Sequence, residues 1–494
     1  MKRTIPLVLL AAAALVLIGL VLAQRDPASR FTDDHEAWEA YVEGDRLLQS
    51  FRWAEAEDRL AVAIERDPQF TLAHAAFAEL HARMGLRTMA AEHFATADSL
   101  AALDDDPYSR LLVQVRLSNH GQSRFYEDRD SLLTRAKEIV GDHVLVLASE
   151  AVRAAEAGEV ERAETVWNRV LEINPNYAAA YNYLGYLYLA QGRYDEAEAA
   201  MRRYAFVAPD LANPHDSLGE VLMTVGRYEE AEVEFRTALA KQPDFFHSLM
   251  NIGRIYMLRG QVDKANELLD RVHQEVAGTE WEHEVEIRRL RALFMHRITD
   301  ELDTYAARYI EANPEASYTA YVRIWRRLAL GDQAGTLALL DSLNAEHQAS
   351  EWYQNNPAKR ARAEVDQLRY RGLVAEMAGD HASAAQAFRQ TITEQSDLPP
   401  HSTSFERIHL AYNLVSIDEL QEAREQVRTV LEVNPRLPEA VLVGALIEAA
   451  AGDVASAHRY LDTLERMLER ADADFPTLVD ARQVRAQLPD PGRI

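Results

Sequence analysis

The sequence predicts an all-α protein built as an α-solenoid, a linear stack of two-helix hairpins. Two columns of glycine and one of alanine, each recurring at the same constant spacing, indicate this fold. The columns are Gly185, Gly219 and Gly253; Gly158, Gly192, Gly226 and Gly260; and Ala163, Ala197, Ala231 and Ala265. A fixed period of about 34 residues means that one supersecondary unit is stacked many times, and such arrays normally present surface to other molecules.

The composition agrees with a helical array. Of 494 residues, 48% are hydrophobic, while there are only 20 glycines and 17 prolines, and no Pro-rich or Gly/Ser-rich linker interrupts the chain. A repeat array grows by adding neighbours, so we expect one continuous solenoid despite the length. The sequence leaves open whether the array breaks into two lobes near Glu280, and whether it self-associates.

The charge and the cysteine count exclude several classes of function. The formal net charge of −26 repels nucleic-acid phosphates and anionic lipid headgroups, so neither is expected as a partner. This acidity fits the solubility of a large surface better than an acidic docking surface. The absence of cysteine rules out disulfides, thiolate nucleophiles and cysteine-based metal sites.

The chain begins with a predicted export segment. Lys2 and Arg3 precede an uncharged run over residues 5–23, and positive residues before an apolar segment keep that end in the cytoplasm. Two interpretations stay open: a retained membrane anchor, favoured by the length of the run, or a signal peptide cleaved after Ala23. Both predict a periplasmic or otherwise extracytoplasmic location. An anchor would attach the protein to the cytoplasmic membrane through residues 5–23 alone, whereas cleavage near Ala23 would release it.

The repeat unit over residues 178–211 shows why a hairpin forms. Apolar and aromatic residues fall at helical spacing on a first helix, a Gln-Gly-Arg turn follows, and Ala197 lies in a second helix. A glycine or alanine where the two helices cross lets their backbones approach closely. Gly192 can adopt the left-handed conformation that ends a helix, and Pro209 stops the second helix because it lacks an amide proton.

These residues resemble the tetratricopeptide repeat (TPR) family, whose pattern of aromatic, leucine, glycine, tyrosine, alanine, bulky residue and proline they follow in order. The matching residues are Tyr181, Leu184, Gly185, Tyr188, Ala197, Met201, Tyr204 and Pro209, and the next copy matches through Leu218, Gly219, Leu222, Gly226, Tyr228, Ala231, Phe235, Ala238 and Pro243. The resemblance implies a right-handed superhelix of stacked hairpins.

The resemblance covers most of the chain, though unevenly. The expected segments are a signal peptide or anchor (1–24), a polar spacer (25–34), N-terminal hairpins of which the last is degenerate (35–143), four regular repeats (144–279), divergent hairpins (280–403), C-terminal repeats (404–470), and a capping helix with a tail (471–494).

In TPR proteins the first helices line a concave groove, so the resemblance implies a binding groove at the matching positions. These positions recur with the same period as the glycines, but their chemistry changes from copy to copy, as expected where a ligand dictates the side chain. The predicted groove residues are Asn182, Tyr183, Tyr186, Asn213, Asp216, Glu220, His247, Asn251 and Arg254. The alternative is structural: Glu220 would pair with Arg254, and the tyrosines would pack.

Some TPR proteins hold a terminal carboxylate with Lys, Asn and Arg residues. Asn251 and Arg254 supply part of such a set, but Asp216 and Glu220 place acid beside them and no lysine occupies the matching positions. An extended peptide or a partner helix therefore suits this groove better. A basic island over residues 288–371, with 13 basic and 11 acidic residues, is a second candidate contact, for an anionic partner or for the chain's own acidic flank.

A search for catalytic motifs finds none. The sequence has no His-Glu-x-x-His, no phosphate loop and no Gly-x-Ser-x-Gly. His74 and His81 share a helical face but lack a third ligand within range, so no metal or cofactor is expected. The sequence therefore predicts a non-catalytic interaction scaffold of the cell envelope. The alternatives are an enzyme subunit, for example one acting on cell-wall glycan, and a carrier that binds a small ligand or saccharide near Tyr183 and Tyr186.

Overall fold

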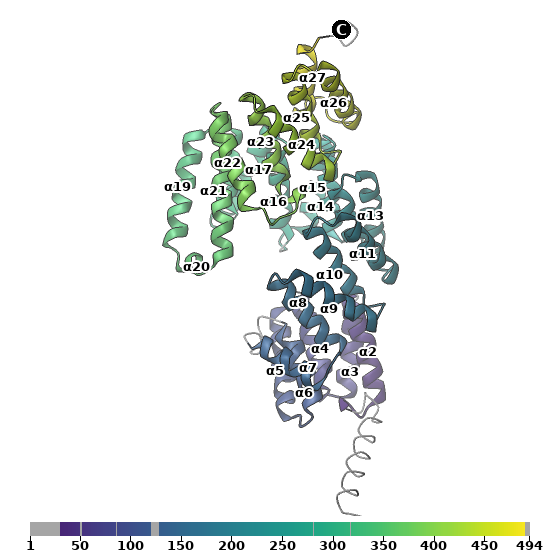
Figure 1. The fold of residues 1–494 in the computed structure, drawn as a ribbon. Helices are drawn as coiled ribbons and strands as arrows, with labels where there is room; N and C mark the ends of the chain where they lie inside the picture. Colours follow the sequence, from purple (N-terminus) through teal and green to yellow (C-terminus); the bar gives the residue numbers. More distant parts are fainter. Residues whose placement is uncertain are drawn as a thin grey trace, which may run out of the picture. The chain divides into compact units, whose positions relative to one another are not determined.

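The computed structural model describes most of the chain. The described residues are 30–49, 52–84, 86–119, 128–279, 281–316 and 318–489. Their regular secondary structure is helical throughout and runs from α2 to α27 (Figure 1), so the chain is an all-α solenoid. The predicted export segment, residues 1–24, lies outside the described residues. Within them, none of the helices combines the length and the apolar character that crossing a bilayer requires.

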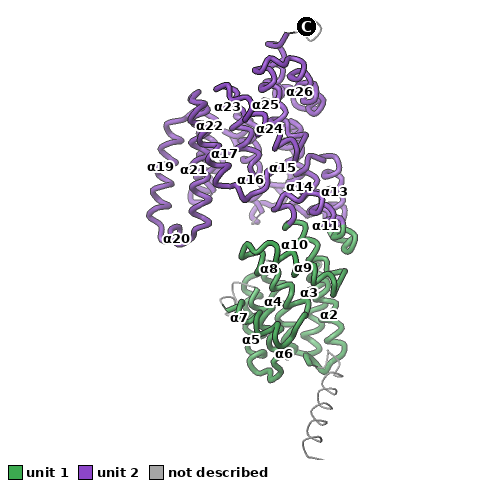
Figure 2. Tube along the Cα trace, in the orientation of Figure 1, with its two compact units in different colours: residues 1–187, 203–211 green, residues 188–202, 212–494 purple. Residues whose placement is uncertain are grey.

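The chain divides into two compact units, residues 1–187 with 203–211, and residues 188–202 with 212–494 (Figure 2). The helices of unit 1 are α2 (His35–Gln49), α3 (Trp53–Arg66), α4 (Thr71–Arg83), α5 (Arg87–Leu103), α6 (Pro107–Ser118), α7 (Arg129–Ile139), α8 (Val144–Glu156) and α9 (Val160–Ile173). The unit boundary crosses the next two helices, α10 (Ala178–Ala190) and α11 (Tyr194–Val207).

Unit 2 continues the alternation of first and second helices, and a short 3-10 helix precedes its last repeats. Its remaining helices are α12 (Asn213–Thr224), α13 (Tyr228–Lys241), α14 (Phe246–Leu258), α15 (Val262–Val276), α16 (Trp281–Met295), α17 (Thr299–Ala312), α18 (Thr319–Ala329), α19 (Gln333–Ala349), α20 (Glu351–Gln354), α21 (Pro357–Met377), α22 (His381–Glu394), η2 (Pro400–Thr403), α23 (Ser404–Ser416), α24 (Leu420–Val433), α25 (Pro438–Ala450), α26 (Val454–Met467) and α27 (Pro476–Gln487).

In several hairpins a glycine of the first helix faces a bulky residue of the second helix. A Cβ atom added at Gly219 would lie 2.6 Å from Phe235, and one at Gly444 would lie 2.7 Å from Tyr460. At Gly253 the nearest atom, on Leu269, is 3.2 Å away. The small residue therefore sets how closely the two helices approach.

Two other columns behave as the sequence predicts. The alanines of the second helices, Ala163, Ala197, Ala231 and Ala265, are each 0% exposed. The turn glycines have positive φ: 75° at Gly158, 72° at Gly192, 79° at Gly226 and 69° at Gly260. Residues with a Cβ rarely adopt this conformation, which explains why glycine recurs at the ends of these four first helices.

Unit 2 folds back on itself at a regular sequence separation. Tyr194 Oη and His401 Nδ1 lie 3.1 Å apart across 207 residues, and Tyr228 Oη donates to the Arg436 carbonyl oxygen at 3.3 Å across 208 residues. The Asp263 amide donates to Asp472 Oδ2 at 3.1 Å across 209 residues. The three separations are nearly equal and close to six repeat lengths. The late repeats of unit 2 therefore contact the turns of its early repeats at a constant repeat interval.

We expect the change in stability caused by a glycine-to-alanine substitution on a first helix to depend on how closely the second helix packs against that glycine. Gly219→Ala should destabilise the protein by about 1–3 kcal/mol, because overpacking against Phe235 outweighs the gain of up to about 1 kcal/mol in helix propensity. Gly253→Ala should change stability by less than about 1 kcal/mol, because a small shift of the Leu269 side chain accommodates the added methyl group. Urea unfolding followed by circular dichroism measures both, and equal effects would contradict this account of the hairpin.

Candidate functional site

The nine residues predicted to line the groove all lie on first helices. Asn182, Tyr183 and Tyr186 are on α10 and belong to unit 1, whereas the other six are on α12 and α14 and belong to unit 2. We call the surface formed by the first helices of unit 2 around these six residues the first-helix face.

In unit 1 the two tyrosines are the most open of the predicted residues. Tyr183 is 39% exposed and Tyr186 is 38% exposed. The Tyr183 ring stacks on the Trp167 ring of α9 with 4.8 Å between centroids and 10° between planes. Tyr183 therefore packs on one side, as the structural alternative expects, and still presents ring surface to solvent. Asn182, on the same helix, is half-buried.

The acidic half of the first-helix face is largely buried. Asp216 is 5% exposed, and its Oδ1 accepts a hydrogen bond of 2.7 Å from Ser248 Oγ of α14. Asn251 is 2% exposed, and its amide donates to Glu220 Oε1 at 3.5 Å. Burial, followed by the nearby charge of Glu220, raises the pKa of Asp216 to about 7. This carboxyl therefore changes charge near neutral pH.

The other half of the face carries nitrogen-containing side chains. His247 meets the ring of Trp281 edge-on, with 4.8 Å between centroids. Burial, then the charge of Arg288, lowers the pKa of His247, which keeps its imidazole neutral at pH 7. Arg254 is exposed to solvent, yet desolvation by surrounding atoms, then Arg291, lowers its pKa. Asn213, at the start of α12, is half-buried.

Sequence reasoning missed several residues of this face. Arg288 was predicted only as part of the basic island, yet it stands one repeat period after Arg254 on the next first helix, so the same column also places it on this face. Trp281 likewise stands one repeat period after His247, which it contacts, so the column through Asn213 and His247 predicts it. Ser248 contacts Asp216 but carries no periodic signal. His401 reaches this part of unit 2 only through the fold-back, and the charge of Arg254 contributes to the lowering of the His401 pKa, after burial.

The basic island of residues 288–371 is largely neutralised by the chain itself. Arg289 pairs with Asp270 at 2.6 Å, Arg326 with Asp303 at 2.6 Å, and Arg371 with Asp341 at 2.5 Å. Of the two interpretations that the sequence leaves open, these pairs favour contact with the chain's own acidic residues. Arg291, like Arg308 and Arg323, makes no ion pair with the described part of the chain.

Unit 1 carries a matching polar cluster that is satisfied internally. Asp45 and Glu79 directly follow the small residues of their first helices, as Glu220 and Arg254 do in unit 2. Arg116 is 1% exposed; its Nε donates to Glu79 at 2.8 Å, Nη2 donates to Asp45, and Nη1 donates to Tyr41 Oη at 3.2 Å. Arg116 of α6 thus joins Asp45 of α2 and Glu79 of α4, and without these acids it would be an uncompensated buried cation, so this cluster fixes how the first three hairpins stack.

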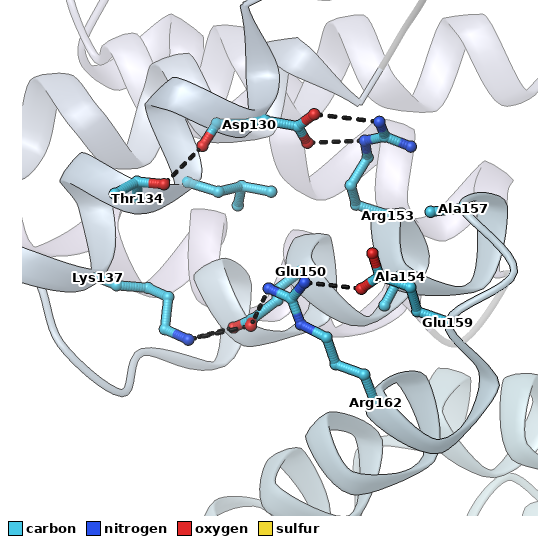
Figure 3. Close-up of a pocket in the computed structure, with 10 residues that line it drawn as sticks. Asp130, Thr134, Lys137, Glu150, Arg153, Ala154, Ala157, Glu159 and Arg162 are labelled. Atoms are coloured by element: carbon cyan, nitrogen blue, oxygen red, sulfur yellow. Dashed lines mark hydrogen bonds and ion pairs between the residues drawn. The ribbon is translucent and has the colours of Figure 1, made fainter.

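A cavity of about 260 Å³ opens between α7, α8 and α9 of unit 1 (Figure 3). Ion pairs line it: Arg153 Nε lies 2.7 Å from Asp130, and Glu150 is bound by both Lys137 and Arg162, at 2.9 Å each. Because the charges of its walls are compensated by one another, the cavity offers little to recognise a charged ligand.

His74 and His81, which share a helical face, both pack against a third histidine, His93. His74 Nδ1 lies 3.2 Å from Nδ1 of His93, and His74 Nε2 lies 3.1 Å from the Pro68 carbonyl oxygen. Burial, with the charges of His74 and His81, lowers the pKa of His93 to about 4. Over the residues that the structure describes, no three His, Cys, Asp or Glu side chains are arranged to hold a metal ion.

Comparisons with known proteins identify the repeat. Two segments, residues 166–199 and 222–282, match family models described as Tetratricopeptide repeat. These matches agree with the tetratricopeptide repeat pattern of the residues in these segments. No curated protein matches the chain by sequence.

Several solved structures are similar to this chain to different degrees. The APC/C hetero-tetramer Cut9-Hcn1 is similar, with a TM-score of 0.56 and 10% identity over 92% of this chain and 84% of that chain. Yeast Tom70 gives a TM-score of 0.38 at 14% identity, over 92% of this chain and 97% of that one. MamA from Desulfovibrio magneticus RS-1 gives a TM-score of 0.31 at 19% identity, over 34% of this chain and 95% of that one. At such identities the likeness to Cut9-Hcn1 shows the fold alone.

The raised pKa of Asp216 predicts a pH-dependent stability. The folded state binds a proton more tightly than the unfolded state does, so stability falls as the pH rises from about 4 to about 7. Asp216→Asn keeps an oxygen acceptor for Ser248 and removes the buried charge. It should add about 1–3 kcal/mol of stability at pH 8 and almost none at pH 4.

Urea unfolding across this pH range, beside the exposed Asp397→Asn as a control, measures the effect. An Asp216→Asn protein whose stability parallels the wild type at every pH would show that Asp216 ionises normally.

Proposed function

We propose that this protein is a non-catalytic scaffold of the cell envelope that binds an extended peptide or a helix of a partner protein on its first helices. One observation carries the proposal. The packing positions keep their chemistry from repeat to repeat, whereas Tyr186, Glu220 and Arg254 occupy equivalent first-helix positions with an aromatic, an acidic and a basic side chain. Packing of the two helices within a hairpin does not account for that variation, whereas recognition of a ligand would.

The known uses of the fold support protein binding. Arrays of stacked helical repeats present extended surfaces, and Cut9, whose fold is similar, was crystallised in a hetero-tetramer with Hcn1. By analogy, this chain holds partner proteins on the surface its repeats build. That analogy is fold-level and names no partner.

The chemistry of the first-helix face suits binding better than turnover. His247 and Trp281 contact each other, Asn251 donates to Glu220, and Ser248 donates to Asp216, so these groups are engaged within the protein. A mixed surface of aromatic, amide and charged groups recognises a peptide through alternating side-chain contacts. An activity screen on the purified protein distinguishes this proposal from an enzyme subunit.

Substitution on the first helices should abolish partner capture. We expect the full-length protein, cross-linked in native envelopes, to retain a defined protein that the folded Tyr186→Ala, Arg254→Glu variant loses. The matched control is Phe206→Ala with Arg271→Glu, which changes one exposed aromatic and one exposed arginine on second helices. Quantitative mass spectrometry of the cross-linked products compares the three proteins. Equal capture by all three would place the interaction elsewhere.

The envelope location is proposed from residues 2–23 alone, through the basic start and the apolar run. We expect a C-terminal fusion to a reporter enzyme that is active only outside the cytoplasm to be active, and to lose activity when residues 2–23 are deleted. N-terminal sequencing of the fusion then separates the two forms of export: a start at Gln24 indicates cleavage, and an intact N-terminus in the membrane fraction indicates an anchor. An inactive full-length fusion would contradict export.

A further inference from the structure

Two arginines of the first-helix face have no acidic partner within the described part of the protein. Arg254 of α14 and Arg291 of α16 are both exposed and, among the described residues, form no ion pair. Neighbouring arginines do pair: Arg288 Nε lies 2.6 Å from Glu284, and Arg289 Nη1 lies 2.6 Å from Asp270. The absence of a partner therefore distinguishes these two side chains from their neighbours, in a chain whose net charge is −26.

The fold-back of unit 2 brings neutral polar groups near the two cations. Arg254 acts electrostatically on Tyr228 at the start of α13 and on His401 of η2, and Arg291 acts on Tyr370 of α21. Burial raises the pKa of both tyrosines to about 12, so their hydroxyls stay protonated. The groups that these distant elements place near the arginines are therefore neutral hydroxyl and imidazole groups, which do not compensate a positive charge.

The acid that acts on Arg254 comes from the preceding first helix. The charge of Glu220 of α12 acts to raise the pKa of Arg254, but its effect is smaller than the effects of Arg291 and Tyr228. Desolvation, then repulsion by Arg291, lowers the pKa of Arg254. The positive charge of this side chain is therefore poorly compensated by the described residues. A carboxylate of a bound partner would offset the desolvation of Arg254 and its repulsion with Arg291, because guanidinium groups bind carboxylates through paired charge-assisted hydrogen bonds.

We propose that the first-helix face of unit 2 takes an acidic segment of a partner protein, whose Asp or Glu side chains form ion pairs with Arg254 and Arg291. This inference rests on the proposed function and adds the chemistry of the partner. A segment is favoured over a small free anion because the face extends over three consecutive first helices, α12, α14 and α16, and includes the aromatic surface of Trp281. Side chains along one peptide can reach all of these positions.

Phage display of random peptides embedded within a coat protein tests the inference. Embedding leaves no peptide terminus free, so carboxylates come from side chains alone. The baits are the full-length wild type, the Arg254→Gln, Arg291→Gln variant, and a control with Arg271→Gln and Arg308→Gln, which removes two exposed arginines from the second helices α15 and α17. Thermal unfolding establishes that all three are folded.

We expect the wild type and the control to enrich peptides containing Asp and Glu, and the Arg254→Gln, Arg291→Gln variant to lose this preference. A selected acidic peptide should bind that variant at least about 10-fold more weakly, and the control less than about 2-fold more weakly. An Arg254→Glu, Arg291→Glu variant should select Lys- and Arg-containing peptides instead.

The outcomes separate this inference from the proposed function. Peptides selected without acidic preference, or with a preference that the Arg254→Gln, Arg291→Gln variant keeps, would overturn the inference and leave peptide binding intact. Binding only to peptides with a free C-terminus, in a matched library, would also overturn it, because the ligand would then be a terminal carboxylate. Failure of the wild type to select any peptide would count against the proposed function itself.

Discussion

The close approach of the two helices in each hairpin is the constraint on which the rest of the structure depends. A glycine or alanine of the first helix faces a large side chain of the second, as Gly219 faces Phe235 and Gly444 faces Tyr460. Because the large side chain occupies the space that a Cβ atom would fill, the pair can pack at only one separation and in one register. Repeating this contact in successive hairpins repeats the same orientation of each first helix.

That fixed orientation determines which side chains are available for binding. The residue that follows the small position is Asp45 and Glu79 in unit 1, and Glu220 and Arg254 in unit 2. In unit 1 the two acids are bound by the buried Arg116 and serve the stacking of the hairpins. In unit 2 Arg254 forms no ion pair with the described residues. Equivalent positions therefore hold the fold together in one unit and, at Arg254, carry the proposed recognition of a partner in the other.

Much of the fold could be predicted from the sequence because hairpin formation is local. The turn glycines, the buried alanines and the helix-stopping prolines each act within one repeat, so their constant spacing reveals them. The candidate site was predictable only in part. The column through Glu220 and Arg254 has a periodic signal, but nothing near Asp216 in the sequence shows that Ser248 and Asn251 bury its carboxyl and that its pKa rises to about 7.

The sequence by itself determined the hairpin, its packing residues and the first-helix columns, because these arise from interactions within one repeat. Only the tertiary structure decided which distant repeats meet, such as Tyr194 with His401 across 207 residues and Tyr228 with Arg436 across 208 residues. The small rotation between successive hairpins sets those contacts. It accumulates over several repeats from packing at every interface, so no single residue pattern encodes it. The same accumulated rotation brought His401 within the electrostatic reach of Arg254.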